Sequence, residues 1–174
     1  MTEIKIRDAK IDDAANILKI YAYYVENTAI TFEITVPTLE NFRSRIKNTF
    51  EEKYPYIVAE IDKKIVGYAY AGHFVGREAY KYSAELTIYL DKDFRGRGIG
   101  KKLYSELENR LQTAEIKNLY ACIGYPEVED EYLTFASVKF HERLGFKICG
   151  KFTECGRKFN RWYSMIWMEK IISS

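Results

Sequence analysis

The chain has 174 residues, of which 47% are hydrophobic and 30% are charged, with only three prolines. This balance excludes a disordered or fibrous chain and is typical of one compact domain, since a single hydrophobic core commonly serves roughly 100 to 200 residues. The net charge is only +2, so a general nucleic-acid-binding surface has little support and any basic site must be local.

The first half of the chain predicts a strand, two helices and three further strands. Residues 3–7 alternate as in a strand, and an amphipathic helix follows with Asp12 or Asp13 as its cap. Thr38 can cap a second helix, whose apolar face comprises Leu39, Phe42, Ile46 and Phe50. The three strands are expected at residues 56–61, 64–72 and 83–90, the first two joined by a turn at Asp62-Lys63.

The second half predicts a helix, a buried strand, a shorter helix and two closing strands. Leucines at 103, 107 and 111 predict a helix at 101–112 that packs on a sheet. An acidic loop follows at 126–135, and Gly145 stands where a left-handed helix end belongs. The strands are expected at 118–124, 146–154 and 162–170, and the shorter helix at 136–144. No repeat or linker interrupts the pattern, so we expect one α/β (α+β) domain spanning residues 1–174.

Targeting and metal-binding signals are not apparent in the sequence. The N-terminus lacks the apolar segment of a signal peptide, and no run approaches the roughly 18 apolar residues that span a bilayer. We therefore expect a cytoplasmic protein with neither a membrane nor a nucleic-acid partner. The three cysteines have no Cys-x-x-Cys spacing, and only two histidines are present, so we expect reduced thiols and no metal site.

Three glycines lie between basic residues in RGRGIG, residues 95–100, where a strand gives way to a helix. A P-loop would require glycine at the position of Arg95 and a hydroxyl at that of Lys102. A dinucleotide fingerprint requires Gly-x-Gly-x-x-Gly, whereas this spacing is Gly-x-Gly-x-Gly. Nucleoside-triphosphate and hydride chemistry are therefore poorly supported.

The same cluster nevertheless has the properties of an anion site. Glycines expose backbone N–H groups, and a helix starting near Lys101 would add unsatisfied donors and a positive dipole end. Arg95, Arg97, Lys101 and Lys102 supply enough charge for a diphosphate with a further phosphate nearby. A glycine-rich turn with solvated charges is the alternative that spacing alone leaves open.

The segment Arg95-Gly96-Arg97-Gly98-Ile99-Gly100 resembles the Arg/Gln-x-x-Gly-x-Gly/Ala signature of the GNAT superfamily of N-acetyltransferases. From about residue 4 to residue 170, the chain is similar to the phosphinothricin acetyltransferase group of that superfamily. The matching stretches are Phe32-Glu33, GYAYAG at 67–72, Arg77 with Ala79-Tyr80, Glu85 before TIYL, SVKFHERLGF at 137–146, and Gly156-x-Lys158 with Trp162.

This resemblance implies a twisted, mixed and mostly antiparallel sheet with helices on both faces. It also implies acetyl-CoA as cosubstrate, with pantetheine lying where the strand before the glycine turn splays from its neighbour. The implied cofactor-binding residues are Ile88, Tyr89, Leu90, Arg95, Gly96, Arg97, Gly98, Ile99, Gly100, Lys101, Thr134 and Ser137.

Acetyl transfer to an amine needs a base, a donor to the thioester carbonyl and a proton for the thiolate. The resemblance places a catalytic carboxylate at Glu85, where burial could raise its pKa into a useful range. His141 matches a family histidine proposed to assist deprotonation or orient the base; packing is the alternative. Cys122 could carry an acetyl group, but no paired base is evident, so we expect direct transfer.

The resemblance also implies a small acceptor and a homodimer. The acceptor would be an amino acid or analogue such as phosphinothricin, methionine sulfone or methionine sulfoximine. The residues at family positions around it are Phe32, Glu33, Arg77, Tyr80, Lys158 and Trp162.

The sequence departs from the family pattern at four points. Thr134 stands where an asparagine near the cofactor is usual, and the loop at 126–136 is longer and more acidic. Ser164 replaces an aspartate, and His73 replaces a proline. We expect acetyl-CoA binding to survive these changes, whereas the identity of the acceptor does not follow from the resemblance.

Two other functions stay open at this point. The acidic residues 127–131 could attract a cationic acceptor, which would suit a peptide, a protein N-terminus or a polyamine. A non-catalytic CoA-binding sensor is the alternative of another class, and it would bind acetyl-CoA without transferring the acetyl group.

Overall fold

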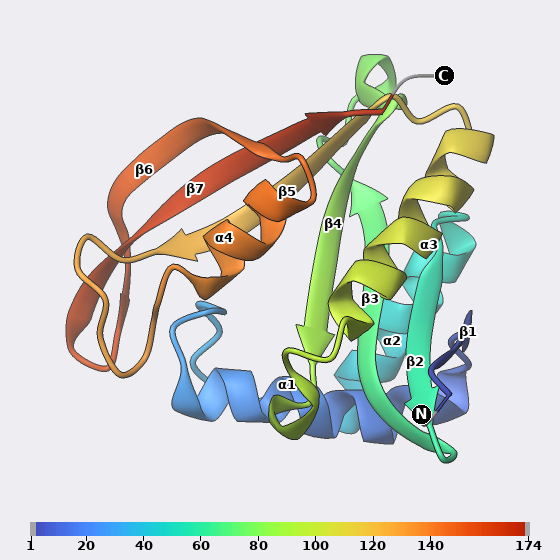
Figure 1. Ribbon diagram of the computed structural model, residues 1–174, viewed down its shortest axis with the longest axis horizontal. Helices are drawn as coiled ribbons and strands as arrows, with labels where there is room; N and C mark the ends of the chain where they lie inside the picture. Colours follow the sequence, from blue (N-terminus) through green and yellow to red (C-terminus); the bar gives the residue numbers. More distant parts are fainter. Residues whose placement is uncertain (1–2, 173–174) are drawn as a thin grey trace.

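A computed structural model describes residues 3–172 and shows a twisted sheet with helices on both faces (Figure 1). Within these residues the sheet has seven strands, in the order β1-β2-β3-β4-β5-β7-β6. Neighbouring strands are antiparallel except for β4 and β5, which are parallel. This confirms the mixed, mostly antiparallel sheet that the resemblance implied.

The strands are β1 (Lys5–Asp8), β2 (Tyr56–Ile61), β3 (Lys64–His73), β4 (Ser83–Leu90), β5 (Asn118–Tyr125), β6 (Lys147–Lys158) and β7 (Arg161–Ile171). The helices are α1 (Ala14–Asn27), α2 (Leu39–Glu51), α3 (Ile99–Thr113) and α4 (Ala136–Arg143). Single 3-10 turns lie at η1 (Ile11–Asp13), η2 (Glu78–Tyr80) and η3 (Lys92–Phe94). None of the helices in the described part of the chain has the length and apolar character needed to cross a membrane.

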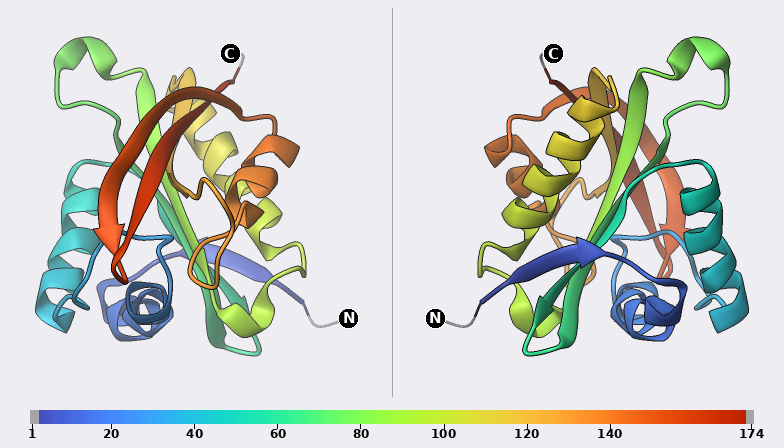
Figure 2. Two further views of the ribbon diagram at one scale, coloured as in Figure 1. Left: turned by 90° about the vertical axis from the view of Figure 1, so that its left-hand side faces the viewer. Right: turned by 90° about the vertical axis from the view of Figure 1, so that its right-hand side faces the viewer.

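Helices α1 and α2 cover one face of the sheet, and α3 and α4 cover the other (Figure 2). Because side chains alternate along a strand, β4 contributes to both layers. Its Leu86 packs in the core beneath α3, whereas Tyr89 packs against Tyr21 and Tyr24 of α1. Glu85 and Thr87 therefore share the α1/α2 side with Tyr89.

Local signals account for most element boundaries. The hydroxyl of Thr38 accepts the backbone N–H of Asn41 at 3.2 Å and caps α2 as expected. Asp62 and Lys63 both have positive φ, as a two-residue hairpin turn requires. Gly145 ends α4 with a left-handed φ of 90°.

Several boundaries differ from the sequence-based expectation. Helix α3 begins at Ile99, two residues before Lys101, because Gly98 already adopts the N-cap position. Asp13 precedes α1 but makes no capping bond, since its carboxylate instead accepts from Arg7 and from the Lys10 backbone. Strand β6 extends past Glu154 to Lys158 through two irregularities in its register with β7.

Strands β4 and β5 separate shortly after they pair. Their register comprises only Ser83 with Asn118, Ala84 with Leu119, and Glu85 with Tyr120. Strand β5 meanwhile pairs with β7 along its whole length. The expected splay is confirmed: beyond Glu85, β4 diverges from its parallel neighbour and leaves an opening through the sheet.

Candidate active site

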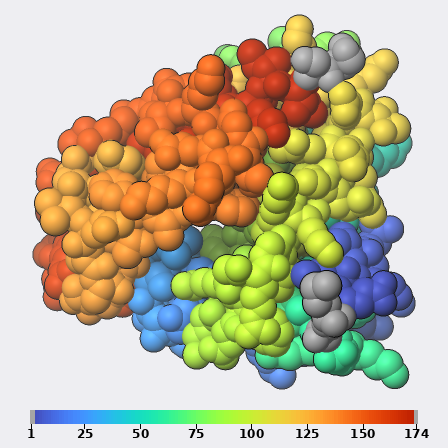
Figure 3. Space-filling view, viewed as in Figure 1, coloured from blue at the N-terminus to red at the C-terminus, as the bar shows by residue number. Residues whose placement is uncertain are grey.

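A cavity of about 400 Å³ lies at the separation of β4 and β5. Its lining comes from both layers of the fold, so it passes from the α1/α2 side of the sheet to the α3/α4 side. The space-filling view shows a hollow between the orange segment around α4 and the yellow-green start of α3 (Figure 3). The cavity thus connects the two faces of the sheet at the point where β4 and β5 separate.

The α1/α2 side of the cavity is walled by polar and aromatic residues. They come from α1, α2, the loop between these helices, and β3 and β4, and they include Tyr21, Thr31, Phe32, Phe42, Arg45, Thr49, Tyr70 and Thr87. We call this side the acceptor wall. The side formed by α3 and α4 includes Tyr104, Ser137 and His141, and we call it the cofactor wall.

Glu85 lies at the junction of the two walls, on the last residue of β4 that pairs with β5. Burial raises the pKa of its carboxyl group above the ordinary value, since the low-dielectric surroundings disfavour the charged form. Its carboxylate makes no hydrogen bond or ion pair within residues 3–172. An unpaired carboxylate with a raised pKa is suited to accept a proton from a substrate.

His141 is buried on the cofactor wall and uses both ring nitrogens. Nδ1 lies 2.7 Å from the carbonyl oxygen of Ser137, so it must carry the proton and donate. Nε2 then accepts from the hydroxyl of Tyr104, also at 2.7 Å. Burial lowers the pKa of His141 to about 4, so the ring is neutral at physiological pH. These contacts favour a role in positioning Tyr104 over direct proton abstraction.

The glycine turn before α3 has the geometry of an anion site. Gly96 and Gly98 have φ of 75° and 78°, in the left-handed region that favours glycine, and a Cβ on either would meet no protein atom within 4 Å. Gly98 is the N-cap of α3, so the first N–H groups of this helix have no intrahelical partner. This glycine turn and the start of α3 therefore fit a pyrophosphate group that is bound by backbone N–H donors.

Gly100 serves a different purpose from the other two glycines. It lies inside α3, where a Cβ would approach the ring of Phe140 to 3.0 Å. This glycine therefore lets α4 pack closely on α3, which brings His141 next to Tyr104. Buried Ile99 anchors the same turn in the core.

The other predicted cofactor residues are placed in three ways. Ile88, Tyr89 and Ser137 line the cavity, while the Leu90 carbonyl accepts the Tyr24 hydroxyl at 2.5 Å. The remaining members are exposed side chains near the start of α3 or α4: Arg95, Arg97, Lys101 and Thr134. The hydroxyl of Thr134 accepts the backbone N–H of Ala136 and does not line the cavity.

The predicted acceptor residues divide into those near the cavity and those outside it. Phe32 lines the acceptor wall, and a Cβ on Gly156 would collide with its ring. Buried Lys158 donates to the carbonyl oxygen of Thr31 at 2.9 Å, so the Gly156-x-Lys158 motif holds the α1–α2 loop against β6. Arg77, Tyr80 and Trp162 are exposed and do not line this cavity, so their role in binding the acceptor stays a prediction.

Glu33 is connected to the cavity through Arg45, a residue that the sequence analysis did not identify. The Arg45 Nη1 donates to Glu33 Oε1 at 2.6 Å. Tyr104 and Thr31 were also missed. Arg45 lies among polar residues of α2 and Tyr104 lies on the buried face of α3, so neither carries a local signal that separates it from ordinary helix residues.

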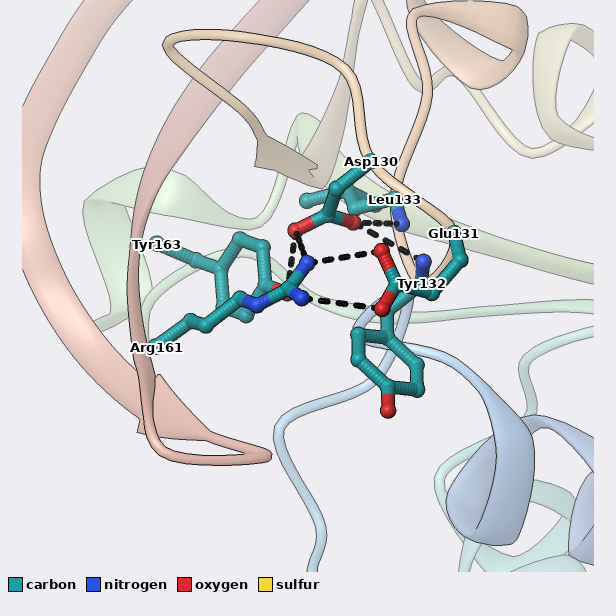
Figure 4. A network of polar contacts seen from close by, with 6 residues as sticks. All are labelled: Asp130, Glu131, Tyr132, Leu133, Arg161 and Tyr163. Atoms are coloured by element: carbon teal, nitrogen blue, oxygen red, sulfur yellow. Dashed lines mark hydrogen bonds and ion pairs between the residues drawn. The ribbon is translucent and has the colours of Figure 1, made fainter.

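The long acidic loop is fastened to the β6–β7 hairpin (Figure 4). The carboxylate of Asp130 accepts backbone N–H groups of Tyr132 and Leu133 and also bonds Arg161 and the Tyr163 hydroxyl. Although partial burial opposes it, this set of donors lowers the pKa of Asp130. Arg161 also forms a two-pronged pair with Glu131.

The same loop explains the serine at position 164. Its buried hydroxyl donates to Glu127 and accepts the backbone N–H of Glu154 within an irregular part of β6. Glu127 also pairs with Lys151. The acidic side chains of the loop thus bind neighbouring parts of the protein, which weakens the idea that they recruit a cationic acceptor.

Cys122 lines the cavity near Glu85, but its thiol is poorly suited to carry an acetyl group. Desolvation, with smaller contributions from Glu85 and Cys155, raises its pKa to about 11, so it stays protonated at neutral pH. The part of the chain that the structure describes contains no cluster of three or more potential metal ligands among His, Cys, Asp and Glu.

Comparison with known proteins identifies the family. Residues 6–167 match the acetyltransferase (GNAT) domain. The chain is 32% identical to a phosphinothricin N-acetyltransferase of Alcaligenes faecalis over 97% of its length and 83% of the relative. It is also 32% identical to an L-methionine sulfoximine/L-methionine sulfone acetyltransferase of Pseudomonas aeruginosa, over 94% of this chain and 92% of the relative.

A solved structure supports the same conclusion. The phosphinothricin acetyltransferase of Sinorhizobium meliloti in complex with AcCoA has a TM-score of 0.89 and 33% identity, over 99% of this chain and 90% of that one. The open glycine turn and the separated strands fit that cosubstrate. The chain belongs to the GNAT family and is an acetyl-CoA-dependent N-acetyltransferase similar to the phosphinothricin acetyltransferase group.

Proposed function

We propose that this enzyme acetylates the primary amine of a small amino acid or amino acid analogue by direct attack, with Glu85 as the base. The observation that carries the proposal is the unpaired Glu85 carboxylate at the junction of the two walls, with its pKa raised by burial. The names of the relatives, phosphinothricin and methionine sulfoximine/sulfone acetyltransferases, suggest the class of acceptor.

In this scheme the amine nitrogen attacks the thioester carbonyl carbon, and Glu85 accepts the proton released as the C–N bond forms. The C–S bond then breaks, the electron pair leaves on the CoA sulfur, and this thiolate takes up a proton, so that CoA departs as the free thiol. Glu85 acts directly or through a water molecule. The raised pKa of Cys122 argues against an acetylated cysteine on the route.

Tyr104 and His141 form a hydrogen-bonded pair on the cofactor wall. The Ser137 carbonyl fixes the proton of His141 on Nδ1, and Nε2 fixes the direction of the Tyr104 hydroxyl. We propose that His141 is a positioning residue for this hydroxyl. Gly96, Gly98 and the first turn of α3 bind the pyrophosphate, with the basic side chains of the turn adding charge.

The exposed aromatic and aliphatic residues around the β6–β7 hairpin support a homodimer, which the resemblance also implies. Phe152 and Trp162 are among them, and Tyr80 and Tyr82 in the β3–β4 connection are exposed as well. Pairing of two copies would remove such apolar surface from water. Light scattering after size exclusion would test this, and a monomer at micromolar concentration would contradict it. The cytoplasmic location likewise stays a prediction.

The function is tested by acetyl-CoA-dependent release of free thiol across a panel of amines. The panel contains methionine sulfone, phosphinothricin, polyamines and short peptides. We expect the amino acid analogues to be the preferred acceptors. Activity confined to peptides or polyamines would overturn the choice of acceptor, and tight acetyl-CoA binding without transfer to any amine would indicate a sensor.

A further inference from the structure

Arg45 is the cationic side chain that the acceptor wall presents to the cavity, and no role follows for it from the catalytic scheme. It lies on α2 and lines the cavity together with Thr31, Phe32 and Glu85. Its side chain is 44% exposed, so it faces the opening and is accessible to a ligand. Arg45 is paired with Glu33, but a guanidinium has five N–H donors, so donors are left for a ligand group that offers oxygen acceptors.

Two protein contacts fix the orientation of the Arg45 guanidinium. Its Nε donates to Asn41 Oδ1 at 2.9 Å, one helical turn earlier on α2. Its Nη1 donates to Glu33 Oε1 at 2.6 Å, from the loop between α1 and α2. The aromatic ring of Phe42 lies 6.0 Å from the guanidinium carbon. The side chain is therefore held in one direction before any acceptor binds.

These contacts leave part of the guanidinium unused. Within residues 3–172, Nη2 donates to no protein atom, although Arg45 lines the cavity. The planar guanidinium matches two oxygens of a carboxylate or a similar oxyanion. The hydroxyls of Tyr21 and Thr31, which line the same cavity, are bonded to each other at 2.8 Å.

We propose that Arg45 binds an anionic oxygen group of the acetyl acceptor, such as its carboxylate, and thereby turns the amine toward Glu85. The inference rests on the proposed function, since it concerns the acceptor of the same reaction. Glu33 and Asn41 orient the guanidinium, and Lys158 contributes by holding the Thr31 carbonyl of the same loop. The enzyme accordingly selects amines that carry an oxyanion over neutral amines and polyamines.

The experiment compares acceptors that differ in the anionic groups they carry. Thiol release is measured with methionine sulfone, with its α-carboxamide and with phosphinothricin, using wild type and the variants Arg45→Gln, Arg45→Lys and Arg43→Gln. Arg43 is an exposed arginine on the same helix that does not line the cavity, so it controls for lost helix charge. Thermal unfolding of each variant controls for folding.

We expect Arg45→Gln to lower kcat/KM for methionine sulfone by about 10- to 100-fold, mainly through KM, the range for loss of a charged hydrogen bond. For the carboxamide, the same substitution should lower kcat/KM by less than about 3-fold, because this acceptor lacks the anion that Arg45 binds. Arg45→Lys should recover part of the loss, and Arg43→Gln should match wild type. A loss seen only with phosphinothricin would support the proposal and assign Arg45 to the side-chain oxyanion.

Equal losses for methionine sulfone and its carboxamide would overturn the proposal, since Arg45 would then only fasten Glu33 and the loop. The absence of any loss would overturn it as well. If wild type acetylates none of these acceptors, the proposed function fails separately. In that case, calorimetric titration of methionine sulfone into CoA-saturated protein tests whether Arg45 binds the acceptor. The proposal is contradicted if wild type and Arg45→Gln bind methionine sulfone equally tightly, or if neither binds it.

Discussion

The two walls of the cavity differ in the groups that they offer to a ligand. Beside the cofactor wall, the turn before α3 offers backbone: the left-handed Gly96 and Gly98 and the N–H groups at the start of α3 that have no intrahelical partner. The acceptor wall uses side chains that come together from distant parts of the chain. Glu33 and Arg45 are 12 residues apart, and Lys158 reaches Thr31 across 127 residues.

This difference shows which kind of site can change easily. A backbone cradle requires glycines at fixed spacing, so it tolerates little variation and produces a short motif. A wall built from side chains keeps its fold when one residue is exchanged, because the strands and helices around it remain packed. We infer that the cofactor wall defines the reaction of this enzyme, while the acceptor wall defines its substrate.

The largest effect is expected at the junction of the walls. Glu85→Gln should lower turnover by roughly 100-fold or more and leave acetyl-CoA affinity unchanged, within the usual range for loss of a general base. Glu142→Gln, an exposed change on α4, is the control. The same substitution should raise the melting temperature at neutral pH, because a buried carboxyl with a raised pKa costs stability once it is ionised.

If the turnover of Glu85→Gln equals that of wild type across the pH range, Glu85 is not the base. The reaction would then not take place at the junction of the two walls.

A second change should act on the cofactor wall. Gly98→Val should weaken acetyl-CoA binding by about 10-fold or more, since valine disfavours the φ of 78° and its branches fill the space for the ligand. Gly98→Asn separates backbone strain from obstruction of the ligand, because asparagine tolerates a left-handed backbone but still adds a side chain. Gly150→Val, at an open position on β6 with ordinary φ, is the matched control in a calorimetric titration.

Wild-type affinity in both Gly98 variants would contradict the pyrophosphate assignment.

A third prediction concerns the acidic loop that supports the acceptor wall. Asp130→Ala removes the acceptor of four hydrogen bonds and should lower the free energy of unfolding by about 1 to 3 kcal/mol. Glu131→Ala is the neighbouring comparison. Glu131 also pairs with Arg161, but it is 60% exposed, so its loss should change the free energy of unfolding little. Urea unfolding of the two variants measures the difference.

The effect of Asp130 also has a defined pH dependence. Its folded-state pKa is lowered, so its contribution is present above the unfolded pKa and is lost as pH falls through the folded value. The gap between wild type and Asp130→Ala should therefore shrink in acid. A gap that widens in acid, or equal losses for Asp130→Ala and Glu131→Ala, would show that the loop is held in another way.

The smallest effect is expected for the pH profile of a His141 variant. The acid limb of kcat/KM should belong to Glu85 and lie above the ordinary range for glutamate, because burial raises that pKa. His141 has a pKa of about 4 and both nitrogens bonded, so His141→Asn should lower kcat without moving the limb. A limb that disappears with His141 and persists in Glu85→Gln would reverse the two roles.

The sequence predicted the fold and the glycine turn better than the side chains that gather around the cavity, for physical reasons. Apolar periodicity, the Thr38 cap and the Asp62-Lys63 turn are local, so strands and helices were found to within a few residues. The glycine turn is also local. Glu85 and His141 were proposed from the resemblance, but their burial and hydrogen bonding depend on α3 and α4 packing around them.

Arg45 could not be predicted in the same way. On the sequence it is one of several charged residues on the polar face of α2, and its position at the cavity depends on how α2 packs on the sheet. Tyr104 likewise fits the apolar stripe of α3, and only the approach of α4 reveals its bond to His141.

The most direct test of the division between the walls is a calorimetric measurement on Gly98→Val and Arg45→Gln. Each variant is titrated with acetyl-CoA and, after saturation with CoA, with methionine sulfone. Gly98→Val should weaken acetyl-CoA binding and Arg45→Gln should weaken methionine sulfone binding, each leaving the other ligand within about 3-fold of wild type. Comparable loss of both ligands in either variant would contradict the account.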